Sequence, residues 1–149
     1  MKAWHLLPLA LSAMLAFSSA IAAESHGTAA EAKAMLQRAV AELKIDRTKA
    51  LNEFNAGQNG FRDRDLYVFC FNGGDGKLTA HPTLLGQDVR TLIDKGGAHF
   101  GQEMYIQAKE GAISELSYLF PRPGSSEPTL KESYYTRVGD QVCGVGFYK

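Results

Sequence analysis

The stretch from Asp65 to Pro82, DLYVFCFNGGDGKLTAHP, constrains the fold of this chain more than any other segment. Residues 66–71 alternate aromatic side chains on one face with aliphatic side chains and a cysteine on the other, so both faces of the predicted strand are apolar. A strand of this kind is typical of the centre of a sheet. A second apolar run, residues 78–81, predicts the return strand of a hairpin.

The glycine-bearing loop between these two strands does not match a phosphate-binding or calcium-binding motif. A P-loop would need Gly in place of Phe71 and Ser or Thr in place of Leu78, and a dinucleotide-binding fingerprint would need Gly in place of Thr79. An EF-hand loop would need acidic ligands where Phe71 and Gly73 stand. The loop therefore predicts a hairpin turn, with Asn72-Gly73 as its signal.

The first 22 residues have the pattern of a secretory signal peptide. Lys2 supplies a positive end, an apolar run follows from Leu6 to Phe17, and Ala20-Ile21-Ala22 offers a cleavage site. A retained membrane anchor is the alternative, but the apolar run is short for a span. We therefore expect a periplasmic or secreted protein that consists of one domain, residues 23–149.

Charge is balanced in this chain. The sequence has 16 basic and 16 acidic residues, and neither sign forms a run. This composition argues against nucleic acid or an anionic membrane surface as a partner.

The remaining pattern predicts an α+β domain. Thr28 and Glu31 form a capping box that begins a helix, which either continues past Asp46 or restarts there and then stops at Gly57. Two short helices are expected within residues 84–93 and 100–108, and three further strands over residues 113–120, 131–138 and 142–148. Hairpin connections at both ends indicate an antiparallel sheet with helices packed on it.

Four stretches of the chain resemble a single Cache domain, an extracytoplasmic relative of the PAS fold. They are DLYVFCFNGGDGKLTAHPTLLGQDV, FGQEM, LFPRP and EPTLKESYYTRVGDQVCGVGFY. Family members share an aromatic strand, a D-x-x-G turn, a strand that ends in Ala-His-Pro and a closing Gly-x-Gly-x-Tyr strand. This chain has Phe120 where many relatives have Trp.

The resemblance implies a five-stranded antiparallel sheet with a long N-terminal helix behind it and short helices between the second and third strands. It also implies a sensory pocket for a small ligand, often a short carboxylate. A membrane receptor or kinase would read the bound state, and the N-terminal helix is a candidate surface for a homodimer. The alternative is an interaction or structural module that uses the Cache scaffold without a ligand.

Four residues are the predicted ligand site: Lys131, Tyr118, His81 and Tyr134. Lys131 lies on an otherwise apolar strand and would pair with a carboxylate, although a surface lysine that snorkels is the alternative. Tyr118 offers a hydroxyl unless it only packs the sheet, and His81 either faces the ligand or bonds backbone carbonyls at the strand end. Tyr134 points away from Lys131 on a regular strand, so its inclusion requires a bulge or curl.

Catalysis and metal binding are not expected. Ser125-Ser126 lies in GSSEP, which is not a nucleophile elbow. The histidines beyond the leader, His26, His81 and His99, have no metal-ligand spacing, and we expect no cofactor.

Cys70 and Cys143 lie on two different apolar strands. In an exported protein they are either a disulfide pair or two buried small hydrophobes. The PAS-like strand order that the resemblance implies makes their strands neighbours.

Overall fold

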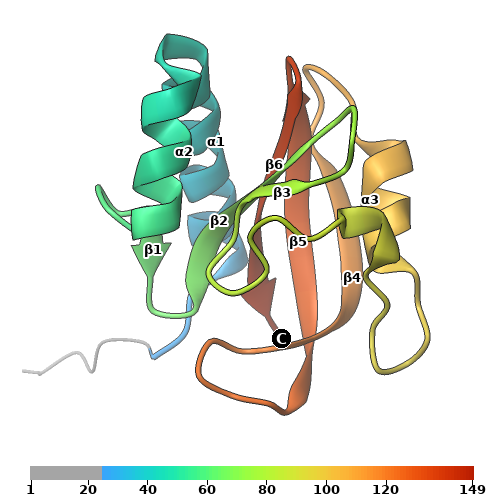
Figure 1. Cartoon of the computed structure of the whole chain (residues 1–149). Coiled ribbons are helices and arrows are strands. Elements are labelled where there is room, and N and C mark those ends of the chain that lie inside the picture. Colours follow the sequence, from blue (N-terminus) through green and yellow to red (C-terminus); the bar gives the residue numbers. More distant parts are fainter. Residues whose placement is uncertain (1–24) are drawn as a thin grey trace, which may run out of the picture.

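A computed structural model describes residues 25–149. The predicted signal peptide and its cleavage site lie outside these residues and stay a prediction. No helix within residues 25–149 has the length and apolar character needed to cross a membrane. Figure 1 shows three layers: the helices α1 and α2 on the left, the sheet in the middle, and α3 on the right.

The helical layer begins where the capping box predicts. In α1 (Ala29–Ile45) the Thr28 hydroxyl accepts a hydrogen bond from the Glu31 amide, and the Glu31 side chain accepts from the Thr28 amide. Asp46 has an extended backbone that ends α1, and its side chain caps α2 (Arg47–Ala56). Gly57 ends α2 in the left-handed region, with φ of 65°. The helix therefore restarts at Asp46.

The sheet is antiparallel throughout. Its strands are β1 (Arg62–Asp63), β2 (Leu66–Asn72), β3 (Leu78–Ala80), β4 (Ser114–Pro121), β5 (Pro128–Val138) and β6 (Gln141–Tyr148). They follow the order β1-β2-β6-β5-β4, with β3 also paired to β2. This confirms the expected α+β, PAS-like sheet and adds the two-residue strand β1.

The first and last long strands lie side by side, which brings the two cysteines together. Cys70 on β2 is directly opposite Cys143 on β6, and the structure joins them in a disulfide across 73 residues of sequence.

The β2–β3 hairpin forms, but its turn differs from the predicted one. The Asn72 side chain accepts hydrogen bonds from the amides of Gly74 and Asp75, at 2.8 and 3.2 Å. The loop has five residues, and the left-handed glycine is Gly76 (φ 75°) rather than Gly73. Position 73 needs glycine for a different reason: a side chain there would collide with the Arg137 side chain, which occupies the space beside it.

Only one of the two predicted short helices is present. The helix α3 (Phe100–Gln107) forms, whereas residues 84–93 contain just the 3₁₀ turn η1 (Val89–Thr91). The prediction of a helix over 84–93 is wrong because the backbone bonds there to the hairpin. The Leu78 amide donates to the Gln87 carbonyl, and the amides of Gly86 and Val89 donate to the carbonyls of Leu78 and Gly76.

The sheet separates two hydrophobic cores. Alternate residues of β2 face opposite layers: Leu66, Val68 and Cys70 pack with the helices α1 and α2, and Tyr67, Phe69 and Phe71 pack with the η1 segment and α3. This is the double-sided burial that the sequence predicts for a central strand.

Candidate ligand-binding site

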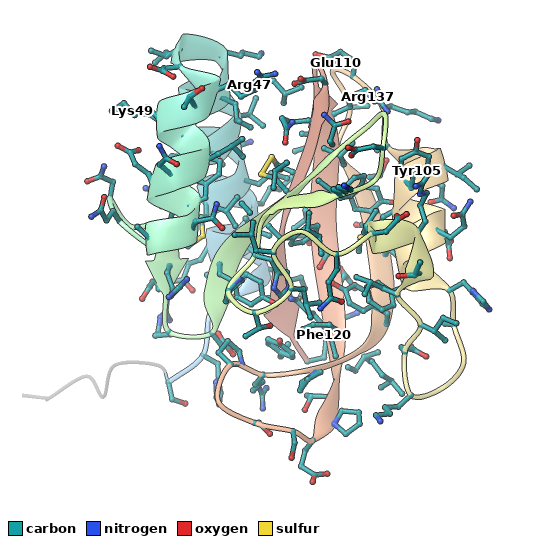
Figure 2. All side chains as sticks on the ribbon, viewed as in Figure 1. Arg47, Lys49, Tyr105, Glu110, Phe120 and Arg137 are labelled. Carbon is teal, nitrogen blue, oxygen red and sulfur yellow. A yellow bond between two sulfur atoms is a disulfide. The ribbon has the colours of Figure 1, made fainter. Side chains whose placement is uncertain are left out.

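Two adjoining cavities lie on the face of the sheet that is turned away from α1. The inner cavity has a volume of about 20 Å³, and the outer groove has about 660 Å³. Six residues line both of them: Tyr67, His81, Leu84, Leu92, Phe100 and Phe120. Figure 2 shows Phe120 at the lower end of the sheet as drawn, close to the β4–β5 connection. The inner cavity and the outer groove are therefore neighbours, with these shared side chains between them.

Lys131 lines the inner cavity and is 1% exposed. Its Nζ donates a hydrogen bond to the Tyr67 hydroxyl at 2.8 Å. Four ring centroids surround the ammonium: Tyr67 at 4.3 Å, Phe120 at 5.0 Å, Tyr148 at 5.4 Å and Phe69 at 5.9 Å. None of the ion pairs within residues 25–149 includes Lys131. Burial lowers the pKa of Lys131 to about 7, against a smaller opposing effect from the Asp65 carboxylate.

A glycine on the neighbouring strand makes room for this lysine. A Cβ atom at Gly146 would lie 2.2 Å from Cε of Lys131 and 2.5 Å from Oγ of Ser133. At Gly144 a Cβ atom would lie 2.4 Å from the Phe69 ring. The Gly-x-Gly pattern of the last strand thus has a physical reason, because both glycines leave space for side chains that form the site.

Tyr118 is opposite Lys131 on β4, and its hydroxyl lies 2.9 Å from Oγ of Ser133. Its ring stacks on Phe100, with centroids 4.2 Å apart. Burial raises the pKa of Tyr118 and of Tyr67. Both phenols therefore stay protonated at neutral pH and can donate hydrogen bonds.

His81 follows β3 and bonds to the backbone of the turn after it. Its Nδ1 accepts hydrogen bonds from the amides of Thr83 and Leu84, each at 3.1 Å, so the bonds are to amides rather than to carbonyls. This arrangement assigns the ring proton to Nε2. Burial, and then the Lys131 charge, lower the pKa of His81 to about 3, so the imidazole is neutral. It lines both cavities and offers an N–H donor.

The structure does not place Tyr134 at this site. Tyr134 packs on Phe147, with centroids 5.8 Å apart, and Nζ of Lys33 lies 5.5 Å from its ring on the α1 side. β5 pairs with β4 and β6 without a register shift, so the alternation of faces holds along it. The prediction for Tyr134 is wrong because it needed a bulge that β5 lacks.

Two site residues were missed by sequence reasoning. Tyr67 makes the hydrogen bond to Lys131, and Phe100 stacks on Tyr118. The alternation of the aromatic strand contains the signal for Tyr67, because it places that hydroxyl on the same face as Phe69 and Phe71. Phe100 has no such signal, since α3 reaches the site only through its packing on the sheet.

One wall of the outer groove is tied to the segment that precedes α1. The Asp65 carboxylate accepts a hydrogen bond from the Gly27 amide at 2.7 Å and lies 3.1 Å from Nδ1 of His26. The Asp65 carboxylate also forms an ion pair with Nε of Arg122, at 3.5 Å. The Arg122 guanidinium lies over the Tyr148 ring, and Arg122 lines the outer groove. Within residues 25–149 there is no cluster of three side chains suited to a metal ion.

Comparison with known proteins gives this site its context. The chain is 26% identical over 168 residues to the methyl-accepting chemotaxis protein McpP of Pseudomonas putida, a match that covers 99% of this chain and 31% of McpP. The chain thus spans about a third of the length of that relative.

Three solved structures share the fold. A methyl-accepting chemotaxis protein from Vibrio parahaemolyticus superposes with a TM-score of 0.65 at 22% identity, covering 80% of this chain and 86% of that one. A Cache chemosensory domain studied for carboxylic acid recognition gives 0.64 at 24% identity, with coverages of 80% and 91%. A periplasmic sensor domain of a chemotaxis protein gives 0.60 at 26% identity, with coverages of 80% and 88%.

Two of these relatives are methyl-accepting chemotaxis proteins, and one is the periplasmic sensor domain of a chemotaxis protein. The model of the family described as Single Cache domain 2 matches residues 10–149, nearly the whole sequence. The chain therefore belongs to the Single Cache domain 2 family of sensory domains.

Proposed function

We propose that this Cache domain is an exported sensor for a small organic acid, and that the carboxylate of the ligand pairs with Lys131. The observation that carries the proposal is a buried ammonium that has one hydrogen bond, to Tyr67, and no ion pair within residues 25–149. An isolated buried charge is costly, and an anionic ligand would offset that cost.

The donors around the inner cavity suit a carboxylate. Besides the ammonium, the Tyr118 hydroxyl and Nε2 of His81 belong to residues that line the same cavity, and the tautomer of His81 makes Nε2 a donor. Carboxylate oxygens accept several such bonds, and charge-assisted ones are the strongest. One solved structure of the same fold was studied for carboxylic acid recognition, which agrees with this ligand class.

In this proposal the domain works outside the cytoplasm and reports ligand occupancy to a chemotaxis-type receptor or a kinase. The family membership and the periplasmic setting of a relative support that role. The alternative is an interaction module without a ligand, and a binding measurement distinguishes the two.

The test is titration calorimetry of the purified protein with acetate, propionate, lactate and pyruvate. Lys131→Met keeps the aliphatic stem and removes the charge, so we expect affinity to fall by about tenfold to a hundredfold, as for loss of a charge-assisted contact of about 1.5–3 kcal/mol. Lys33→Met is the matched control, because Lys33 is also a lysine over a tyrosine ring but lies on the other face of the sheet.

Equal affinities of the wild type and Lys131→Met would contradict Lys131 as the anchor. If the folded wild type binds none of the acids, the ligand-free interaction module is the better description.

A further inference from the structure

The inner cavity and the outer groove differ greatly in size. About 20 Å³ is room for one water-sized group, whereas the outer groove offers about 660 Å³. The inner cavity would take one carboxylate oxygen beside Lys131, so the remainder of the ligand would extend past Phe100 and Phe120 into the outer groove. The size of the groove therefore bears on the chemical class of the ligand.

The walls of the outer groove are mainly apolar. They include Leu92, Ile93, Leu119, Pro82, Pro121 and Pro123. Ile93 is 53% exposed and lies in this apolar wall. An apolar chain lying in the groove would cover Ile93 and remove its surface from water.

Two of the charged groups that line the groove are engaged within the protein. The Asp94 carboxylate accepts hydrogen bonds from the amides of Gly96, Ala98 and Leu119, at 2.8 to 2.9 Å. Arg122 forms an ion pair with Asp65 at 3.5 Å, but its buried Nε has no hydrogen-bond partner within residues 25–149. Lys95 is exposed, so two cationic side chains border the groove and a ligand with a second carboxylate has to be part of the test.

Resting on the proposed function, we infer that the ligand is a monocarboxylate with an apolar chain longer than three carbons. Its carboxylate pairs with Lys131 in the inner cavity, and its chain lies in the outer groove against Leu92, Ile93 and Leu119. The domain would thus sense acids such as straight-chain hexanoate more strongly than acetate.

The experiment is calorimetry of the wild-type protein with acetate, butyrate, hexanoate and octanoate at one pH and salt concentration. We expect affinity to rise with chain length by up to about fourfold per methylene, the factor that corresponds to about 0.8 kcal/mol for each buried CH₂. Hexanedioate, which has the length of hexanoate and a second carboxylate, should bind more weakly than hexanoate.

Ile93→Asn tests the position of the chain. This variant should flatten the dependence of affinity on chain length, because Ile93 lines the outer groove, where the chain would lie, and not the inner cavity. Ile106→Asn is the matched control, since Ile106 is 69% exposed on α3 and lines neither cavity. Circular dichroism melting curves establish that both variants are folded.

Each other result has a distinct meaning. If acetate and butyrate bind and the longer acids bind no better, the inference is wrong and the proposed function stands. Tighter binding of hexanedioate than of hexanoate would replace the monocarboxylate with a dicarboxylate. Binding of none of these acids would overturn both the inference and the proposed function.

Discussion

The Lys131 side chain runs past Gly146 into a ring of four aromatic side chains, where its ammonium has a single hydrogen bond, to Tyr67. The groups that face it are the phenols of Tyr67, Tyr118 and Tyr148 and the imidazole of His81, all neutral near pH 7, while Asp65 acts on it from farther away. Within residues 25–149 the charge is therefore weakly compensated.

This arrangement predicts how stability depends on pH. The pKa of Lys131 is lowered from 10.5 to about 7 in the folded protein, so above pH 7 the unfolded chain binds more protons than the folded one. Stability contributed by this residue should then rise with pH between 7 and 9, by on the order of 1 kcal/mol per pH unit. Urea unfolding at several pH values measures this rise. Lys131→Met should abolish this rise in the free energy of unfolding. A rise of the same size in the variant would show that other titratable groups cause it.

The same shift couples ligand binding to a proton. A carboxylate favours the ammonium form, so its affinity should fall as pH rises above 7. Calorimetry at pH 8 in two buffers of different ionisation enthalpy would show proton uptake on binding, which is the direct signature of Lys131 becoming charged.

Glycine on β6 leaves space that side chains of the neighbouring strand β5 occupy. Gly146 is directly opposite Ser133, and its missing side chain accommodates both Ser133 and the stem of Lys131. This pairing explains why a strand at the centre of a sheet contains glycine, which otherwise weakens a strand.

Gly146→Ala should destabilise the domain by about 1–3 kcal/mol, the usual effect of overfilling a packed site. Lys131→Ala removes Cε of Lys131, the nearer of the two side-chain atoms that the new methyl group would strike, so the double variant should lose less stability than the sum of the two single variants. Urea unfolding of the four proteins measures this coupling. Strict additivity would show that the lysine stem does not occupy the space beside Gly146.

Sequence reasoning predicts the elements well where the pattern is local. The capping box, the stop at Gly57 and the period-two strands depend on neighbouring residues, and the structure confirms them. The helix expected over residues 84–93 fails because its amides bond to the β2–β3 hairpin, a partner that no local pattern reveals. Alternation along residues 131–138 separates Lys131 from Tyr134, whereas the register that puts Tyr118 opposite Lys131 is a long-range pairing that no local pattern reveals.

At the scale of the whole molecule, the disulfide joins the first long strand to the last. Cys70 and Cys143 are both fully buried and close a loop with a sequence separation of 73 residues. The closed loop contains β3, η1, α3, β4 and β5, whereas Tyr67 and Phe69 of β2, which also line the inner cavity, lie just before it.

Replacing both cysteines with alanine should lower the free energy of unfolding by roughly 4 kcal/mol, the loop-closure value for a link of this length. Urea unfolding of the oxidised wild type and the double variant measures the difference. Thiol titration of the unfolded, unreduced wild type is the control and should detect no free thiol. Two free thiols per chain would show that the cysteines are not paired.

The separation of the two cores by the sheet has a mechanical consequence for a sensor. The cavities lie on one face, and α1 and α2 lie on the other, so a bound molecule and these helices share no direct contact surface through the sheet. Along β2, however, Tyr67 faces the inner cavity while its neighbours Leu66 and Val68 touch the helical layer, and rigid peptide bonds join all three. A displacement of Tyr67 that shifts the β2 backbone would therefore also shift Leu66 and Val68, which pack on the helical layer.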